Sequence, residues 1–269
     1  MKYYVIVNIF LFLFLNACTP DFSTNRKNLN PSNKTKMKPS TKIIPNQKEK
    51  KVEEQEVEEQ EVEEEQEDIN QKTLLNDLIN LIEEANAKKE KYIKKMAEEP
   101  SDQYGMLAFD DLGWGKGTES ISDNTQRSIR YRRHTYTLLS LIDDNELKEF
   151  SNIIMITNKT NSLLSNFSNL GGVLDVVTDR LYPKKSNLDK LNTSDLEKIK
   201  ESFEKILSII KSVSETSKQI LLDYQNNKNL IKTDVEKLKS YLDILCNQMR
   251  KKAMEAEKLQ KIILSIKNL

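Results

Sequence analysis

Several residue types that build catalytic and metal sites are scarce in this 269-residue chain. It has one histidine, His134, so a zinc site built on paired histidines is excluded. Its two cysteines, Cys18 and Cys246, lie far apart in the sequence, and no intramolecular disulfide framework is expected. No spacing typical of a Ser-His-Asp arrangement is present. These shortages indicate that the chain is not an enzyme and uses no metal or cofactor.

The composition also lacks the apolar content of a single compact globule. Apolar residues make up 37% of the chain and charged residues 31%, so part of it is expected to be unfolded. Lysine plus arginine equals aspartate plus glutamate at 42 each, so the net charge gives no reason to expect a nucleic-acid partner. Electrostatic binding of a partner would therefore depend on local clusters of charged residues.

Residues 1–17 have the features of a leader. A single positive charge, Lys2, precedes an apolar run from Val5 to Leu15, which is too short to span a bilayer permanently. The run ends in Leu-Asn-Ala before Cys18, where lipoprotein signal peptidase cuts once the thiol is diacylated. An uncleaved anchor helix and an ordinary cleaved signal are the alternatives, but neither explains the cysteine at this position. The sequence predicts a removed signal peptide and a membrane anchor at Cys18.

Residues 18–70 are predicted to form a disordered, charged tether. The stretch from Asp21 to Lys51 is basic and rich in Asn, Ser, Thr, Lys and Pro, with too few apolar residues for a core. The stretch from Val52 to Glu67 repeats VEEQE, and self-repulsion should keep it extended at neutral pH. It is either a binding tail or a solvated spacer, and like-charged blocks favour the spacer.

Residues 71–269 are predicted to be all-α, because apolar residues recur there at spacings of three and four and no long alternation indicates a strand. An irregular, Gly-rich insertion is expected near residues 100–121. Gly171-Gly172 should supply a left-handed helix stop, followed by a short apolar turn from Val173 to Tyr182. The expected helices run from Thr73 to about Glu98, from about Asp123 to Ile142, from Asp143 to Gly171-Gly172, from Thr193 to about Asn226, and from Thr233 almost to Leu269.

The last two predicted helices carry long apolar stripes, which include Leu207 in the first and Leu242 in the second. The polar turn from Asn226 to Asn229 is short enough to fold them back on each other. The predicted fold is therefore a helical bundle with a long antiparallel C-terminal helix pair, preceded by the disordered tether.

Three motifs invite a functional interpretation. The glycine-rich stretch around Trp114 could cradle a phosphate, but its spacing does not match a phosphate loop, so an ordered turn with Trp114 packed in a groove is the better interpretation. Cys246 could be a nucleophile, but it lies on an apolar stripe, where a free cysteine usually packs as a small hydrophobe. The third motif is a basic and aromatic cluster: Arg127, Arg130, Arg132, Arg133 and His134 with Tyr131 and Tyr136. With Trp114 it is a candidate surface for binding a partner protein, although a charged helix face is often only solvated.

The leader MKYYVIVNIFLFLFLNAC, the Lys/Glu-rich stalk, the segment DLGWGKGTESISDNTQRSIRYRRHTYTLL that ends at Leu139 and the helical C-terminal half together resemble a known family. They are similar to the virulent-strain-associated lipoproteins of Lyme disease Borrelia, a group that includes the OspEF-leader-peptide (Elp) surface lipoproteins. The resemblance implies display on the outer membrane surface and contact with the mammalian host. Some members of the wider group bind complement proteases and others bind laminin or plasminogen, but no binding motif transfers to a position here.

Two hypotheses follow. In the first, an outer-surface lipoprotein displays a helical domain that binds a host protein, such as a complement component or a matrix protein, and contributes to virulence. In the second, a periplasmic lipoprotein has a structural or assembly role, and its tether spans the gap between membrane and peptidoglycan. Neither hypothesis involves nucleic acid, because the leader delivers the domain outside the cytoplasm.

Overall fold

The computed structural model describes residues 49–115, 119–267 and 269, with side chains from residue 69 onward. The predicted signal peptide (1–17), Cys18 and the tether up to residue 48 lie outside the described residues. Within the described part the chain is all-α, as the sequence predicts, and its only extended pairing is an isolated bridge between Gly113 and Ser120. None of the helices in this part has the length and apolarity needed to cross a membrane.

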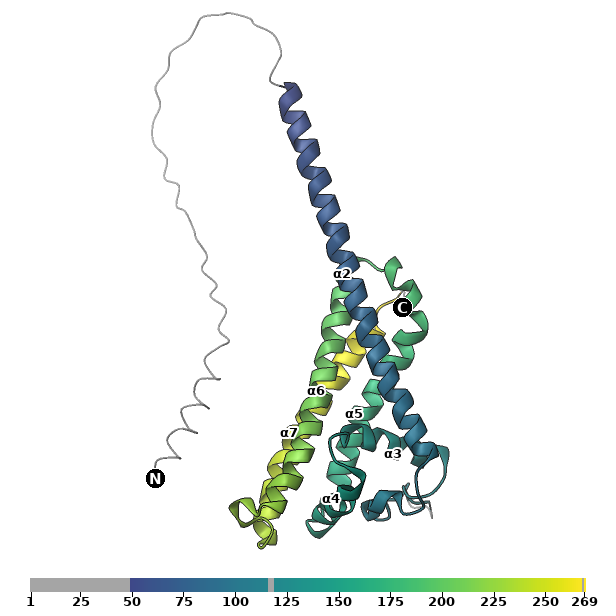
Figure 1. The fold of residues 1–269 in the computed structure, drawn as a ribbon, viewed down its shortest axis with the longest axis vertical. Coiled ribbons are helices and arrows are strands. Elements are labelled where there is room, and N and C mark those ends of the chain that lie inside the picture. Colours follow the sequence, from purple (N-terminus) through teal and green to yellow (C-terminus); the bar gives the residue numbers. More distant parts are fainter. Residues whose placement is uncertain (1–48, 116–118, 268) are drawn as a thin grey trace, which may run out of the picture. The chain divides into compact units, whose positions relative to one another are not determined.

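Six α-helices build the part of the domain that the structure describes, and 3-10 helices lie in the connections (Figure 1). The predicted irregular insertion is present between the first two α-helices and contains η1 and η2. The elements are α2 (Glu49–Ala97), η1 (Gln103–Gly105), η2 (Leu107–Phe109), α3 (Gln126–Leu138), α4 (Asp144–Ile156), α5 (Thr160–Leu181), η3 (Tyr182–Lys190), α6 (Thr193–Gln225), η4 (Lys228–Leu230) and α7 (Val235–Leu264).

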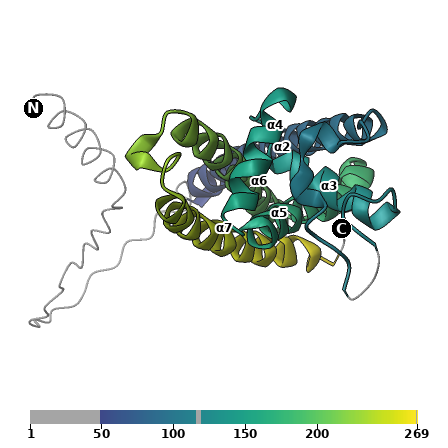
Figure 2. The same ribbon diagram turned by 90° about the horizontal axis from the view of Figure 1, so that it is seen from below.

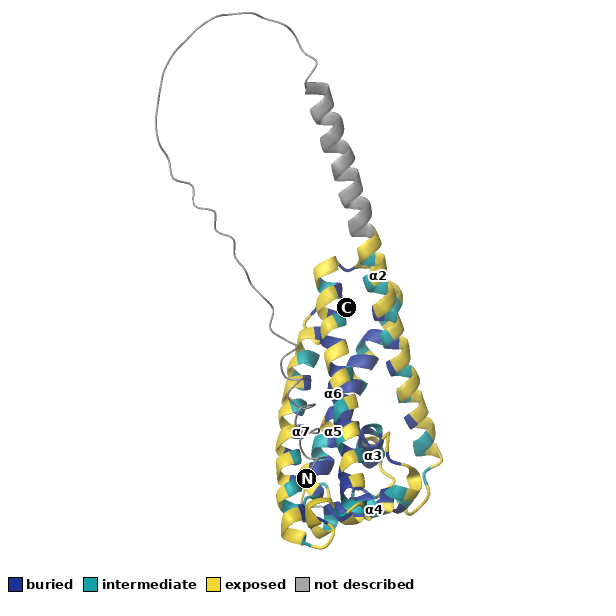
Figure 3. Cartoon of the chain, turned by 60° about the vertical axis from the view of Figure 1, so that its left-hand side comes forward, coloured by how far each residue is buried: buried dark blue, intermediate teal, exposed yellow. Residues whose placement is uncertain are grey.

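Helix α5 is the centre of the bundle. It packs against α3, α4, α6 and α7, and Figure 2 shows these helices around it. Its apolar residues, which include Leu163, Phe167, Leu170 and Val177, are fully buried. In Figure 3 the buried residues gather on the inward faces of the helices and the exposed residues on the outward faces, as expected when each helix contributes one apolar stripe to a shared core.

The predicted antiparallel C-terminal pair is present, since α6 and α7 pack along each other (Figure 1). Helix α6 begins after Asn192, whose side-chain oxygen accepts a hydrogen bond from the Asp195 backbone N–H at 2.8 Å. Helix α7 begins after Asp234, which accepts from the backbone N–H groups of Glu236 and Lys237. These caps satisfy amides that would otherwise lack partners, and they fix where each helix starts.

The acidic repeat differs from the expected extended segment, because α2 begins at Glu49 rather than near Thr73. No proline or glycine lies between Glu49 and Ala97, and glutamate is a good helix former. Once the packed part of the helix around Leu78 and Ile82 has formed, each residue added upstream gains one hydrogen bond without a new nucleation cost. Propagation from the packed part therefore outweighs the repulsion between glutamates.

The expected helix stop at Gly171-Gly172 is wrong, because both glycines lie inside α5. Neither has the positive φ of a left-handed helix end. The chain breaks earlier, at Asn158, whose φ of 56° ends α4. The segment from Val173 to Leu181, expected to be a turn, is therefore helical and extends α5 beyond its contact with α3.

Leu242→Asp should abolish cooperative unfolding of the domain, because Leu242 is 0% exposed and the change would place an unpaired charge in the core. Leu207 belongs to the predicted apolar stripe of α6 but is only partly buried, so Leu207→Asp should destabilise the domain less than Leu242→Asp. Ile244→Asp is the matched control, since Ile244 is 60% exposed on the same helix. Urea unfolding followed by circular dichroism measures all three. A cooperative transition for Leu242→Asp, with the same midpoint as Ile244→Asp, would contradict the assigned faces of α7.

Candidate binding surface

Helix α3 carries the arginine and tyrosine residues of the predicted partner-binding cluster, but it points them in three directions. With about 100° between successive residues, positions three or four apart share a face. Ser128, Arg132 and Tyr136 face the core, and Arg127 and Tyr131 face the Gly-rich insertion. The third face carries Arg130, Arg133 and His134. The cluster is therefore not one continuous basic patch.

Arg132 and Tyr136 are buried, which corrects their prediction as partner-binding residues. The Arg132 side chain is 1% exposed and donates hydrogen bonds from Nε and Nη2 to the carboxylate of Glu99, with Nη2 to Oε2 at 2.7 Å. Its Nη1 donates to the backbone carbonyls of Ile121 and Asp123 at 2.6 and 2.8 Å. The Tyr136 hydroxyl lies 2.9 Å from Glu99 Oε1, and burial together with this carboxylate raises the pKa of Tyr136. These residues fasten the insertion to the bundle.

Trp114 packs as the sequence predicts, in an ordered turn. Its indole N–H donates to Ser128 Oγ at 2.8 Å, and its ring meets Tyr131 edge-to-face with centroids 5.8 Å apart. The Arg127 guanidinium lies 4.9 Å from the Trp114 ring centroid, in cation–π geometry, and pairs with Glu119. Residues 116–118 lie outside the described residues, so the rest of the glycine-rich stretch is not placed.

We expect the pair between Glu119 and Arg127 to persist in mild acid. Hydrogen bonds from Arg127 and then Thr125 lower the pKa of Glu119 from 4.5 to about 2. Because the folded pKa lies below the unfolded one, the pair stabilises the fold above about 4.5, and this stabilisation is lost as pH falls from there through about 2.

The single tryptophan reports on this pair. Trp114 fluorescence should stay constant from neutral pH down to the ordinary carboxyl range near 4.5. Glu119→Gln should change the emission over the whole range, because it removes the anion that holds Arg127 over the ring. A fluorescence transition near pH 4.5 that the Glu119→Gln variant lacks would show that Glu119 titrates normally.

The third face of α3 opens onto a groove with a volume of about 790 Å³, which we call the α3 groove. Its size falls within the range of ligand-binding pockets. It is bounded by α2, α3, α5 and α7. Its lining residues are Lys89 and Ile93 from α2, Gln126, Ile129, Arg130, Arg133 and His134 from α3, Ser168, Asn169, Gly172, Val173, Asp175, Val176 and Asp179 from α5, and Glu257, Gln260 and Lys261 from α7.

Charged residues of the groove are held by ion pairs between helices. Asp175 on α5 pairs with Arg133 and accepts a hydrogen bond from His134 Nε2 at 3.0 Å. Burial opposes ionisation of Asp175, but the hydrogen bond with His134 and the charge of Arg133 outweigh it and hold the pKa of Asp175 below its usual range. Lys89 on α2 pairs with Asp179. Among the described residues, no ion pair involves Arg130, which is exposed on α3.

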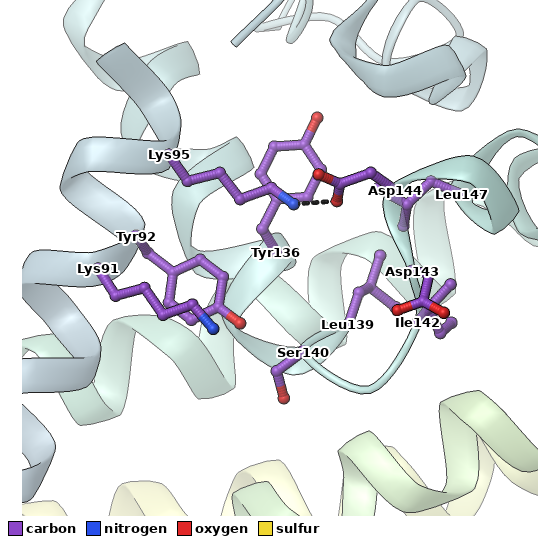
Figure 4. Close-up of a pocket in the computed structure, with 10 residues that line it drawn as sticks. All are labelled: Lys91, Tyr92, Lys95, Tyr136, Leu139, Ser140, Ile142, Asp143, Asp144 and Leu147. Atoms are coloured by element: carbon purple, nitrogen blue, oxygen red, sulfur yellow. Dashed lines mark hydrogen bonds and ion pairs between the residues drawn. The ribbon is translucent and has the colours of Figure 1, made fainter. Parts of the chain in front are cut away.

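A smaller pocket of about 320 Å³ lies where the end of α2 meets the α3–α4 connection (Figure 4). Lys95 reaches into it, pairs with Asp144, and places Nζ 4.5 Å from the ring centroid of Tyr104 and 5.2 Å from that of Tyr136. The groups that would attract a cation are therefore already used by a lysine of the chain itself. The pair of Lys95 and Asp144 links α2 to the start of α4 across this pocket. The pocket is therefore a weaker candidate for a partner-binding site than the α3 groove.

Cys246 lies at the edge of a third pocket, of about 490 Å³, between the start of α5 and α7. The residue is 8% exposed, and burial raises the pKa of its thiol. Its sulfur lies 3.7 Å from Ser162 Oγ. A higher pKa keeps the sulfur protonated and unreactive, so these features support the interpretation of Cys246 as a packing residue.

The contribution of α5 to the α3 groove was missed by sequence reasoning. Because Gly171-Gly172 was expected to end the helix, Asp175 and Val176 were assigned to a turn and could not be placed opposite Arg133. The available signal was the apolar spacing of Leu170, Leu174 and Val177, which continues through the glycines without a change of period. Among the described residues, no group of three or more His, Cys, Asp or Glu could hold a metal ion.

A family model described as Borrelia Bbcrasp-1 domain containing protein matches residues 94–268, which include α3 to α7. A comparison with curated proteins gave no match. The crystal structure of BSE31 from Borrelia (Borreliella) spielmanii is similar at 48% identity with a TM-score of 0.72, and the alignment covers 73% of this chain and 100% of that chain.

Two more distant structures share the fold. The Borrelia burgdorferi outer surface lipoprotein BBA64 is 19% identical with a TM-score of 0.59, over 72% of this chain and 96% of that chain. The Lyme disease associated outer surface protein BBA65 from Borrelia burgdorferi is 20% identical with a TM-score of 0.56, over 66% of this chain and 94% of that chain. The predicted resemblance to surface lipoproteins of Borrelia is thereby confirmed, and the chain belongs to the Borrelia family of Bbcrasp-1 domain containing proteins.

Proposed function

We propose that this chain is a lipoprotein of the bacterial outer surface whose helical domain binds a host protein through the α3 groove. Three observations support the location: the leader before Cys18, the family membership, and the outer-surface names of BBA64 and BBA65. Acylation of Cys18 attaches the chain to the membrane, and the residues between Cys18 and the bundle carry the domain outward.

The α3 groove is the observation that carries the binding role. It is an open concavity in which apolar side chains are exposed beside charged ones: Ile93 is 37% exposed and Val176 is 44% exposed. Arg130 lines the same groove without an ion pair among the described residues. Arginine is enriched in protein-binding hot spots, and a partner that covers the groove would remove its exposed apolar side chains from water. A complement component or a matrix protein is the expected partner class.

Capture from host material tests the binding role. The mature chain, immobilised through its N-terminus, is incubated with mammalian serum and with solubilised matrix, and bound proteins are identified by mass spectrometry. We expect a specific host protein to be retained by the wild type and depleted by the Arg130→Glu variant, with Arg250→Glu on α7 as the matched charge reversal outside the groove. Recovery of the same proteins on a chain unfolded by Leu242→Asp would contradict the proposal.

Protease treatment of intact cells tests the location. A surface lipoprotein is digested while the cells stay intact, whereas a periplasmic structural or assembly lipoprotein is protected until the outer membrane is opened. Cys18→Ser should prevent incorporation of labelled palmitate and release the chain from the membrane fraction. Protection of the wild-type chain in intact cells would overturn the surface location and favour the periplasmic role.

A further inference from the structure

Apolar side chains from three helices line part of the α3 groove. Ile93 of α2 and Val176 of α5 are partly exposed, and Ile129 of α3 and Val173 of α5 also belong to the lining. Covering these side chains removes apolar area from water, which favours an occupant with an aliphatic group.

One guanidinium of the groove lining, that of Arg130, has no ion pair among the described residues. Two of the three carboxylates of the lining are already neutralised, Asp175 by Arg133 and Asp179 by Lys89. Arg130 remains exposed, and no ion pair of the described residues involves it. A guanidinium presents two parallel N–H donors that fit a carboxylate, so Arg130 is suited to one acidic group of a ligand.

The lining also includes side chains that suit a peptide backbone. Gln126, Asn169 and Gln260 line the groove from three different helices, and Ser168 adds a hydroxyl. None of these side chains has a hydrogen bond to another group in the described part of the chain. Amide side chains both donate and accept, as the N–H and C=O groups of an extended peptide require.

We propose that the α3 groove binds a short extended peptide segment of the host partner, in which one carboxylate lies beside an aliphatic side chain. Arg130 binds the carboxylate, the side chains of Ile93 and Val176 contact the aliphatic group, and the amide side chains bind the peptide backbone. This inference rests on the proposed function and specifies the chemistry that the partner must present.

The charges of the groove do not form the uniformly basic surface that a polyanion such as a sulfated polysaccharide needs. Two of the lining cations are already neutralised, because Arg133 pairs with Asp175 and Lys89 pairs with Asp179. The lining also mixes acidic and basic side chains from four helices. This mixture favours an occupant with few acidic groups over a polyanion.

Selection from a random heptapeptide library tests the inference directly. The folded mature chain is the bait, and enriched peptides are synthesised with a fluorescent label for Kd measurements. We expect enriched sequences to contain Asp or Glu within two residues of Leu, Ile or Val. Arg130→Glu and Val176→Asn should each weaken binding at least tenfold, while Arg250→Glu and Ile244→Asn, matched changes at exposed positions of α7, should leave the Kd unchanged.

Three outcomes would overturn the inference: no enrichment above an empty support, enrichment of peptides without an acidic residue, or equal Kd values for the groove and control variants. Retention on heparin that Arg130→Glu abolishes would identify a polyanion site instead. If serum capture still recovers a host protein in any of these cases, the peptide inference fails and the proposed function stands. If capture fails as well, both fail.

Discussion

Gly171→Ala should destabilise the domain by about 3 kcal/mol, which is a large effect for the addition of one methyl group. A Cβ at position 171 would lie 2.5 Å from the backbone oxygen of His134 and 2.7 Å from its Cα. These are backbone atoms, so no side-chain rotation relieves the contact, and α3 and α5 would have to move apart. Because α3 borders the proposed binding groove on one face and the core on another, the shift should also change the groove.

Gly172→Ala is the matched control for this prediction. The nearest atoms to a Cβ at position 172 are in the imidazole of His134, at 3.4 Å, which is ordinary contact. Alanine also favours the helix by about 1 kcal/mol over glycine, so this variant should be as stable as the wild type or more stable. Urea denaturation measures the free energy of unfolding of both variants. Similar midpoints for the two variants would contradict the close crossing of α3 and α5.

Arg132→Met should cost about 3–5 kcal/mol, because it leaves the carboxylate of Glu99 buried without its cation. The Glu99 side chain is 5% exposed, so water cannot replace the guanidinium. The carbonyls of Ile121 and Asp123 lose their donor as well. The double variant Arg132→Met with Glu99→Met should recover part of the loss, since no unpaired charge remains.

Arg127→Met is the control variant, because it removes an arginine of α3 whose ion pair is exposed and not buried. Arg127 lies five residues earlier on α3, and its side chain is 55% exposed in the pair with Glu119. An exposed pair contributes little to stability, so this variant should unfold much closer to the wild type than Arg132→Met does. Thermal unfolding measures the stability of both variants. Equal losses of stability from the two substitutions would show that Arg132 does not form the buried contacts with Glu99 and the two carbonyls.

The helical character of the domain could be predicted because it depends on local apolar spacing. The spacing located α3, α6 and α7 to within a few residues, and it identified the antiparallel pair of α6 and α7. It merged α4 with the first half of α5 into one helix, because the break at Asn158 has no glycine or proline to mark it. The prediction of a helix end at Gly171 was wrong, because the tendency of glycine to end helices was given more weight than the apolar spacing. Gly171 instead lets the backbone of α3 come close to α5. A contact between helices that are distant in sequence leaves no local pattern from which it could be predicted.

The orientation of the α3 side chains could be predicted only in part. Arginine is usually exposed, so Arg132 was assigned to a surface cluster, and its partner Glu99 is 33 residues away in the sequence. Glu99 and the two carbonyls that bind Arg132 come together only after the insertion folds over α3. By contrast, Trp114 was correctly expected to pack in a turn, because glycines on both sides of it favour a turn locally, although its side-chain partners on α3 could not be named from the sequence.

Hydroxyl-radical footprinting of the mature chain with its captured host protein tests the central claim most directly. The claim is that the partner covers the α3 groove, where Ile93 and Val176 are exposed in the free chain. We predict that both side chains lose reactivity in the complex while Ile244, exposed on α7, keeps its own. Unchanged reactivity at Ile93 and Val176, with protection at Ile244, would place the contact elsewhere and contradict the proposed site.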